Sequence, residues 1–260
     1  MTEILEMQVI HDEAPLEMEI DFAGEYVSGA TNEEYEKGKR AAQEEWWETY
    51  LSTRDGRTHL NSGSYVFGFW NSDSFYPTQD INLRSADRAF YNFGYNAPAL
   101  DLTARLEECG VKLDVSKMSA FDYIFANARI TRIPELYFPN KVAFGASFNN
   151  STLLKVIDKI ILNEAGTSTF NSSTFNCKNL EEIRFEGAIG TSITFQYCPL
   201  LSVESMKSII LHLVNYSGTD KELTYTIKFV EDCWTALEES GPAPTGTTWK
   251  EYIDSLGWLW

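Results

Sequence analysis

Histidine and cysteine are the side chains of this sequence best suited to catalysis or metal binding, and neither type falls in a recognised motif. The histidines are His11, His59 and His212, and the cysteines are Cys109, Cys177, Cys198 and Cys233. The sequence has no H-E-x-x-H zinc motif, no G-x-S-x-G nucleophile motif, no phosphate-binding P-loop and no C-x-x-C pair. We therefore predict no catalytic residue, no metal and no cofactor, and buried free thiols in place of disulfides.

The carboxylates leave one enzymatic reading open. Glycosidases cleave sugar chains with two Asp or Glu side chains held a few ångströms apart, and this chain has 38 acidic residues. No pair of them is marked out by its spacing or its neighbours. We expect that the protein is not an enzyme, and a glycan-degrading activity stays as an alternative.

An aromatic-rich segment, SYVFGFWNSDSFYP, offers a chemistry of binding instead. Aromatic rings stack on the apolar faces of sugars, and neighbouring Asn, Asp and Ser side chains bind their hydroxyls. The candidate ligand contacts are Tyr65, Phe69, Trp70, Asp73 and Tyr76. The alternative is that these rings form a buried hydrophobic cap.

The charge of the chain excludes some partners. The net charge is −17, whereas phosphate binding relies on Lys and Arg, so nucleic acid and anionic membrane surfaces are disfavoured. The acidic balance favours solubility, with docking to a basic partner as the alternative. We find no signal peptide and no apolar run of about 18 residues, which predicts synthesis in a cytoplasm, release by lysis and no membrane insertion.

The elements that must position such residues are indicated by an internal repeat. Four phenylalanines, spaced by 23, 27 and 20 residues, are each followed by a small residue and by aliphatic residues at the fifth and eighth positions. The anchors with their small and aliphatic residues are Phe125 (Ala128, Ile130, Ile133), Phe148 (Ser151, Leu153, Val156), Phe175 (Cys177, Leu180, Ile183) and Phe195 (Cys198, Leu200, Val203). The alternative is a chance pattern in a Phe-rich chain.

The repeat predicts a short leucine-rich-repeat-type β-solenoid over 59–205, clearest over 121–205, with parallel strands and one buried phenylalanine column. A single repeat cannot bury its apolar edge, and the next repeat covers it. The segment LEEIRFEG should be a strand with Leu180, Ile183 and Phe185 facing inward and Gly187 turning the chain. RAFYNFGYN around Phe90 is expected to be a degenerate first repeat.

The N-terminal segment 1–30 has eight carboxylates and neither Lys nor Arg. Its alternating apolar residues predict an extended strand with one hydrophobic face. They are Leu16, Met18, Ile20 and Phe22, the candidate partner-docking residues. We interpret the segment as an arm that docks on another protein, the alternative being an edge strand of the protein's own fold.

Helices should close both ends of the repeats. Residues 31–58 contain an amphipathic helix, NEEYEKGKRAAQEEWWETYLS, interpreted as a capping helix. Residues 206–260 should form a mixed C-terminal cap with a helix capped by Ser202, a strand alternating through Leu223, Tyr225, Ile227 and Phe229, and helices near 230–239 and 248–256. The predicted class is therefore α+β.

Four segments resemble a known group of proteins: EYEKGKRAAQEEWWETY with Arg57 and Thr58 after it, LEEIRFEGAIG, LLSVESMKSIILHLVNYSG and CWTALEESGPAPTGTTWKEYIDSLGW. The repeats resemble BspA-like leucine-rich repeats, and the layout over 32–260 is similar to leucine-rich-repeat proteins of Firmicutes phages and prophages, described as tail, baseplate or minor structural proteins.

The resemblance implies a virion structural protein that contacts the host surface through a receptor or adhesion site, with other virion proteins bound by the arm. A host glycan or protein is the implied ligand, and a homo-oligomer is compatible with it. The alternatives are an architectural or capsid-decorating protein without a ligand, and a glycan-degrading tail enzyme.

Overall fold

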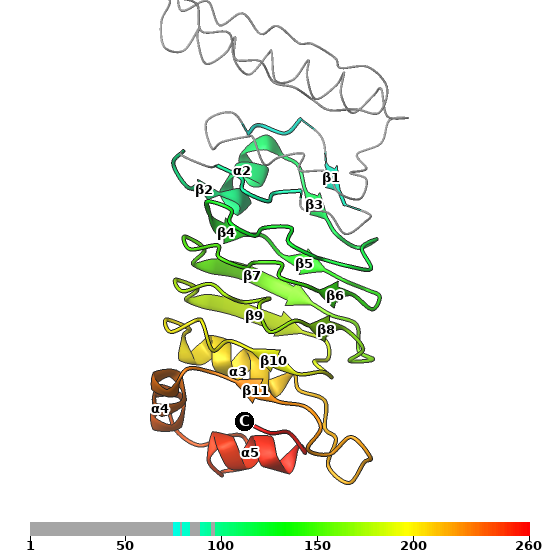
Figure 1. Cartoon of the computed structure of the whole chain (residues 1–260), viewed down its shortest axis with the longest axis vertical. Helices are drawn as coiled ribbons and strands as arrows, with labels where there is room; N and C mark the ends of the chain where they lie inside the picture. The colour runs from blue at the N-terminus through cyan, green and yellow to red at the C-terminus, as the bar shows by residue number, and fades with distance from the viewer. Residues whose placement is uncertain (1–74, 79, 84–88, 95–96) are drawn as a thin grey trace, which may run out of the picture. The chain divides into compact units, whose positions relative to one another are not determined.

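The structure, a computed structural model, describes residues 75–78, 80–83, 89–94 and 97–260. They lie in the second of the chain's two compact units, Ala42–Trp260. Short parallel strands and helices alternate along them, which confirms the predicted α+β class (Figure 1). No helix in these ranges is both long and apolar enough to cross a membrane.

Most strands are very short, and β7 is the longest of those described, with 6 residues. The strands are β1 (Ile81–Asn82), β2 (Leu100–Asp101), β3 (Leu113–Asp114), β4 (Ile130–Ile133), β5 (Leu136–Tyr137), β6 (Ala143–Phe144), β7 (Val156–Ile161), β8 (Thr169–Phe170), β9 (Glu182–Glu186), β10 (Ile193–Thr194) and β11 (Ile227–Lys228). The helices of the described residues are α2 (Leu102–Cys109), α3 (Val203–Leu211), α4 (Glu231–Glu239) and α5 (Trp249–Ser255).

Successive repeats contribute parallel strands to one sheet. β7 pairs with β4 and β5 along one edge and with β9 along the other, and β2 pairs with β4 (Figure 1). In β9, Ile183 and Phe185 are buried while the flanking Glu and Arg side chains are exposed, as the alternating pattern predicts. The parallel direction and the inward residues of β9 are confirmed, as is the turn at Gly187, whose φ is +77°.

The predicted phenylalanine column is confirmed. Phe125, Phe148, Phe175 and Phe195 are buried. Their rings stack in sequence, with centroid separations of 5.9 Å, 5.6 Å and 4.5 Å. Each ring removes apolar surface of its neighbour from water, so the column forms one continuous core through the repeats.

The column continues beyond the four predicted rings. Phe90 stacks on Phe125 at 5.0 Å, as expected of a degenerate first repeat. Phe229 stacks on Phe195 at 5.9 Å and was not predicted, because α3 and a loop separate it from its neighbour by 34 residues. The C-terminal segment therefore adds a further layer to the same core.

A second column consists of the small residues, which donate hydrogen bonds to the preceding repeat. Each of three side chains bonds to the carbonyl oxygen of the phenylalanine one layer before. The pairs are Ser151 with Phe125, Cys177 with Phe148 (2.9 Å) and Cys198 with Phe175 (2.8 Å). The carbonyls of Phe125 and Phe148 also accept from the N–H groups of Ala128 and Ser151, so the side-chain bonds add links from one repeat to the next.

The predicted aliphatic positions are wrong in two repeats. Leu153 is half-buried and Leu200 is 53% exposed, while the next residues, Leu154 and Leu201, are buried. Counting from the phenylalanine gives the wrong residue because the position of the buried leucine depends on the small residue. The buried leucine follows that residue by three positions and its N–H donates back to it, in the pairs Leu154 to Ser151, Leu180 to Cys177 and Leu201 to Cys198. The shift also leaves Val156 and Val203 half-buried.

Asparagines shape the turns after the phenylalanines. Asn127 and Asn150 have φ values of +57° and +56°, a region that Asn tolerates better than most residues. The amide of Asn150 donates to that of Asn127 at 2.7 Å, and the amide of Asn176 donates to that of Asn149 at 2.9 Å. The same turn chemistry therefore joins consecutive repeats.

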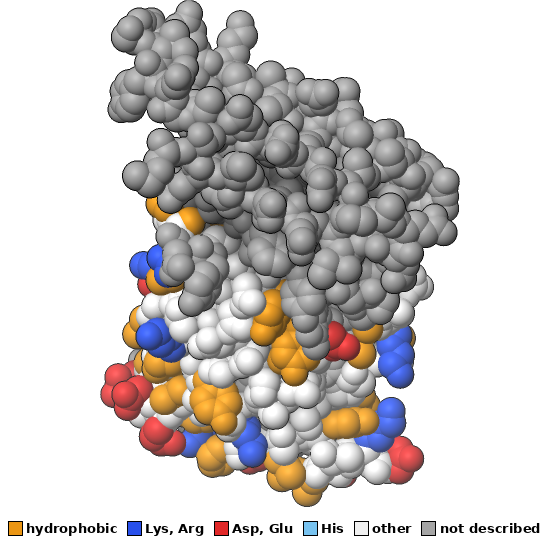
Figure 2. Space-filling view, turned by 45° about the horizontal axis from the view of Figure 1, so that its top comes forward, with side chains coloured by type: hydrophobic (Ala, Val, Ile, Leu, Met, Phe, Trp, Pro, Cys, Tyr) orange, Lys and Arg blue, Asp and Glu red, His pale blue; other side chains and the backbone are white. Residues whose placement is uncertain are grey.

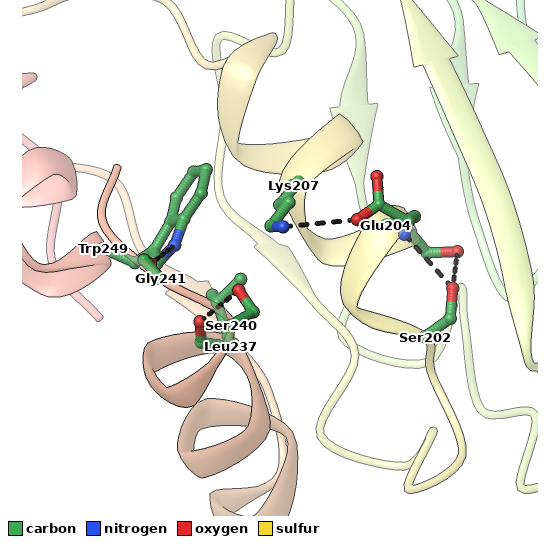
Figure 3. A network of polar contacts seen from close by, with 8 residues as sticks. Ser202, Glu204, Lys207, Leu237, Ser240, Gly241 and Trp249 are labelled. Carbon is green, nitrogen blue, oxygen red and sulfur yellow. Dashed lines mark hydrogen bonds and ion pairs between the residues drawn. The ribbon is translucent and has the colours of Figure 1, made fainter. Parts of the chain in front are cut away.

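Helix α3 closes the outer edge of β9. The backbone N–H groups of Ile183 and Phe185 donate to the hydroxyls of Ser205 and Ser208 at 2.9 Å and 3.0 Å. As predicted, Ser202 caps the helix by accepting from the Ser205 N–H at 3.2 Å (Figure 3). The predicted boundary between residues 205 and 206 therefore falls inside α3.

The two predicted C-terminal helices are confirmed as α4 and α5. The carboxylate of Glu238 in α4 accepts from the N–H groups of Trp249 and Lys250 in the first turn of α5, at 3.1 Å and 3.0 Å. The Trp249 indole donates to the Gly241 carbonyl at 3.0 Å (Figure 3). Helix α4 thus supplies a carboxylate that binds the N-terminus of α5.

The predicted strand through residues 223–229 is largely wrong. Only Ile227–Lys228 is extended as β11, and Leu223 is 53% exposed with a φ of +58°. Turns over 219–224 account for this, since the N–H groups of Glu222 and Thr224 donate to carbonyls three residues earlier. The inward positions of Ile227 and Phe229 are correct.

Some predictions lie outside the described residues. These are the docking arm 1–30, the capping helix 31–58 and the beginning of the predicted solenoid, 59–74.

Candidate functional site

The predicted binding residues are mostly beyond the described part of the chain. Leu16, Met18, Ile20, Phe22, Tyr65, Phe69, Trp70 and Asp73 all lie outside it. Tyr76 is described and half-buried, with the Arg105 guanidinium 3.9 Å from its ring centroid. Its neighbour Phe75 is fully buried against the rings of Phe90 and Phe93. This end of the aromatic segment therefore packs into the core, which favours the buried-cap alternative there.

The described histidine is engaged in the fold. His212 follows α3, and its Nδ1 lies 2.6 Å from the carbonyl oxygen of Ser208. The structure places no group of three His, Cys, Asp or Glu side chains suited to a metal within residues 75–78, 80–83, 89–94 and 97–260.

The three repeat and cap cysteines lie in the core. Burial raises the pKa of Cys198 to about 12, raises that of Cys177 well above its ordinary value and raises that of Cys233. A thiol reacts as the thiolate, so each of these side chains is a poor nucleophile at neutral pH. Cys177 and Cys198 use their sulfurs as hydrogen-bond donors instead.

A polar pocket of about 170 Å³ is the candidate site. Its lining residues belong to β8, β10 and β11 or lie within two residues of them, and Figure 1 shows where these strands lie. Its lining residues are Phe170, Asn171, Ser172, Ser192, Ile193, Thr194, Gln196, Thr226 and Lys228. Such a volume is below the ~300–1,000 Å³ of drug-sized sites, so the pocket suits one unit of a longer ligand.

The pocket forms where neighbouring strands do not pair. β6 pairs with β8 and β10 pairs with β11, but β8 and β10 belong to different sheets. The interruption leaves a polar rim in place of a continuous ladder of strand hydrogen bonds. A ligand can therefore approach side chains of two repeats at once.

The polar side chains of the pocket are partly used and keep bonding capacity. The Ser192 hydroxyl accepts from the Thr226 N–H at 3.0 Å, and the Thr194 hydroxyl accepts from the Gln196 N–H at 3.3 Å. The side-chain oxygen Oδ1 of Asn171 accepts from the Ser173 N–H at 2.8 Å. These bonds fix the side chains, and the Ser172 hydroxyl also donates to the side-chain oxygen of Asn171 at 3.5 Å. A hydroxyl that accepts one bond can still donate its proton, and the Asn171 side chain still has its NH₂ group.

Charge sets this pocket apart from the β7 surface. Lys159 on β7 contacts Glu186 at 2.7 Å and Glu135 at 3.5 Å, and the hydrogen bond to Glu186 raises the pKa of Lys159. Figure 2 shows such mixed groups of basic and acidic side chains near both margins of one face. The pocket lining has no Asp or Glu, and Lys228 forms no ion pair within the described ranges.

The side chains of the lining are suited to hydrogen bonding. Hydroxyls, amides and one ammonium offer hydrogen bonds to a hydroxylated ligand, and the lining holds neither a paired carboxylate nor an imidazole. The prediction from the sequence missed these residues because they meet between repeats. The available signal was the run of small hydroxyl residues around 191–194, which lacks acidic residues in an acidic chain.

Comparisons with known proteins leave the family open. A scan of protein-family models finds none that matches the chain, and comparisons with curated proteins and with solved structures find no match either.

Proposed function

We propose that this chain is a structural protein of a phage particle, carried on the tail or baseplate, which binds a saccharide of the host cell surface and catalyses no reaction. Its repeats form a short leucine-rich-repeat-type solenoid, and its N-terminal arm binds other virion proteins. The resemblance of residues 32–260 to leucine-rich-repeat proteins of Firmicutes phages supports this place in the virion.

The observation that carries the binding role is the polar pocket between β8 and β10. Most of its lining residues carry a hydroxyl, an amide or an ammonium group. Sugars present hydroxyls that both donate and accept, so the hydroxyls of Ser172, Ser192 and Thr194 and the amides of Asn171 and Gln196 are complementary to them.

The apolar residues of the pocket lining are held in place by the hydrophobic core. Phe170 of the lining stacks on Phe144 at 4.9 Å, and its ring lies 6.1 Å from that of Phe175 in the core column. Ile193 of the lining is buried in the same core. A site formed by groups that are already ordered loses less conformational entropy when a ligand binds.

The particle location is tested by labelling. Antibodies against the chain, detected by gold in electron micrographs of phage particles, should mark the tail tip or baseplate. Label on the capsid would favour the decorating alternative, and unlabelled particles would overturn the virion assignment. A lysate of the same host without phage is the control for unspecific label.

The binding role is tested with a glycan array probed by the full-length chain. We expect binding to a restricted set of host-type saccharides, and loss of that binding when Ser192 and Thr194 are both replaced by Ala. Silence on the array would favour the purely architectural alternative. Shortening of the bound saccharides during the incubation would favour the glycan-degrading alternative.

A further inference from the structure

The polar pocket contains a lysine without a counter-charge. Lys228 lies on β11, exposed to solvent, and the part of the chain that the structure describes gives it no carboxylate partner. Lys155 pairs with Glu181 at 3.2 Å and Lys159 pairs with Glu186 at 2.7 Å, whereas Lys228 lies among hydroxyl and amide side chains. An unpaired ammonium among hydroxyls and amides is a feature that saccharide binding alone does not require.

We infer that the saccharide bound in this pocket carries an anionic group, a carboxylate or a phosphate, which Lys228 recognises. This inference rests on the proposed function and names its ligand class. The ammonium donates a charge-assisted hydrogen bond to the anion, while the hydroxyls and amides around it bind the neutral part of the sugar. Such a bond is about twice as strong as one between neutral groups.

The overall charge of −17 does not prevent this recognition. At an ionic strength of 0.15 M, charges more than about 8 Å apart are largely screened from each other. A ligand inside the pocket therefore responds to the groups that line it, and these include one cation and no anion. Arrival of the ligand is slowed by the acidic surface, but its bound state is stabilised locally.

The experiment measures binding of three oligosaccharides of equal length to the full-length protein by titration calorimetry at 0.15 M salt. One carries uronate carboxylates, one is its carboxyl-reduced neutral form, and one carries phosphate esters. We expect at least one anionic ligand to bind about tenfold more tightly than the neutral one. The anion with the larger preference identifies the chemical source of the charge.

Two matched variants assign the preference to the pocket. Lys228→Gln should remove the preference for the anion, so that the variant binds the anionic and the neutral oligosaccharides with equal affinity. Lys178→Gln removes the same charge from an exposed position outside the pocket and should change nothing. Equal melting temperatures of both variants and the wild type show that the fold is intact.

The outcomes separate the inference from the proposed function. Equal binding of neutral and anionic oligosaccharides overturns the inference and supports the proposed function. A preference for anions that survives Lys228→Gln also overturns the inference. Absence of binding to all three oligosaccharides and to the glycan array overturns both.

Discussion

Two strand edges of the repeats end in different ways. The edge of β9 is closed by α3, whose Ser205 and Ser208 hydroxyls accept the N–H groups of the strand. Among the described strands, β8 pairs with β6 and not with β10, and residues of β8 and β10 line a polar pocket. The difference shows that one stack of repeats can satisfy a strand edge with its own side chains in one place and leave polar side chains around a pocket in another.

Breaking the core beneath both edges should have the largest effect. Phe175 contacts the rings of Phe148 and Phe195 above and below it, and also that of Phe170 at the pocket. Phe175→Ala should lower the free energy of unfolding by about 3–5 kcal/mol, because it removes a large buried side chain and leaves a cavity. Urea denaturation followed by tryptophan fluorescence measures the change.

The control for this variant is Tyr197→Ala, which removes an aromatic ring that is 48% exposed in a neighbouring turn. Its effect should stay within about 0.5 kcal/mol. Unchanged unfolding of Phe175→Ala would contradict the column as the core of the repeats.

The two edges should respond differently to the loss of one serine hydroxyl. Ser205→Ala leaves the buried N–H of Ile183 without an acceptor, which should cost about 1–3 kcal/mol of the free energy of unfolding. Ser172→Ala at the pocket removes a hydroxyl that faces solvent and should change stability by less than about 0.5 kcal/mol. Equal losses in both variants would remove the distinction between a closed and an open edge.

A third substitution tests the side-chain hydrogen bonds by which Ser151, Cys177 and Cys198 join one repeat to the preceding one. Cys198→Ser should alter the free energy of unfolding by about 1 kcal/mol or less, because the serine hydroxyl can donate to Phe175 as Ser151 donates to Phe125. Urea denaturation measures this.

Thiol titration completes the test of the cysteines. The wild type, denatured without reductant, should show four free thiols and Cys198→Ser should show three. A count of two or fewer in the wild type would mean that a disulfide forms, and that the thiols of Cys177 and Cys198 are not both free to donate hydrogen bonds to the backbone.

The smallest effect is expected far from both edges, at α5. Hydrogen bonds with the backbone and hydroxyl of Thr248 lower the pKa of Glu251 below its ordinary value of 4.5. A carboxylate with a lowered folded pKa stabilises the fold above its unfolded pKa, and this contribution is lost as pH falls through the folded value. Glu251→Gln should therefore flatten the dependence of stability on pH below about 4.5.

This measurement needs a carboxylate control and a double variant. Glu239→Gln removes an exposed carboxylate at the end of α4 and should preserve the slope with pH. The loss caused by Ser205→Ala should add to that of Glu251→Gln, since the two sites are independent. A strong coupling between them would show that α5 and the closed edge unfold together.

The features that the sequence predicts correctly are those that must occur in every repeat for the repeats to stack. A phenylalanine column needs a phenylalanine in every layer, so Phe125, Phe148 and Phe175 were visible in the spacing alone. The predicted leucine positions were wrong because the buried leucine lies three residues after the small residue, Ser151 or Cys198. Backbone hydrogen bonds fix this spacing, and the spacing of the phenylalanines does not reveal it.

The candidate site could not be predicted in the same way. It exists because β8 and β10 do not pair, and pairing depends on how consecutive layers are displaced from one another. Lys228 is 56 or more residues from Asn171 and Ser172, so no local motif connects them. Phe229 was missed for a related reason, since a helix is inserted between two layers of one column.

The uniform joints between repeats have a consequence for how the protein can change during evolution. The small-residue donor recurs at Ser151, Cys177 and Cys198, and Asn side chains join the turns after Phe125, Phe148 and Phe175. The serines that close the sheet edge lie in α3. A duplicated repeat inserted between β4 and β9 would find matching neighbours on both sides and would leave α3 and the pocket as they are. Each insertion would lengthen the sheet by one strand spacing, about 4.8 Å. The number of repeats therefore sets the length of the sheet in fixed steps.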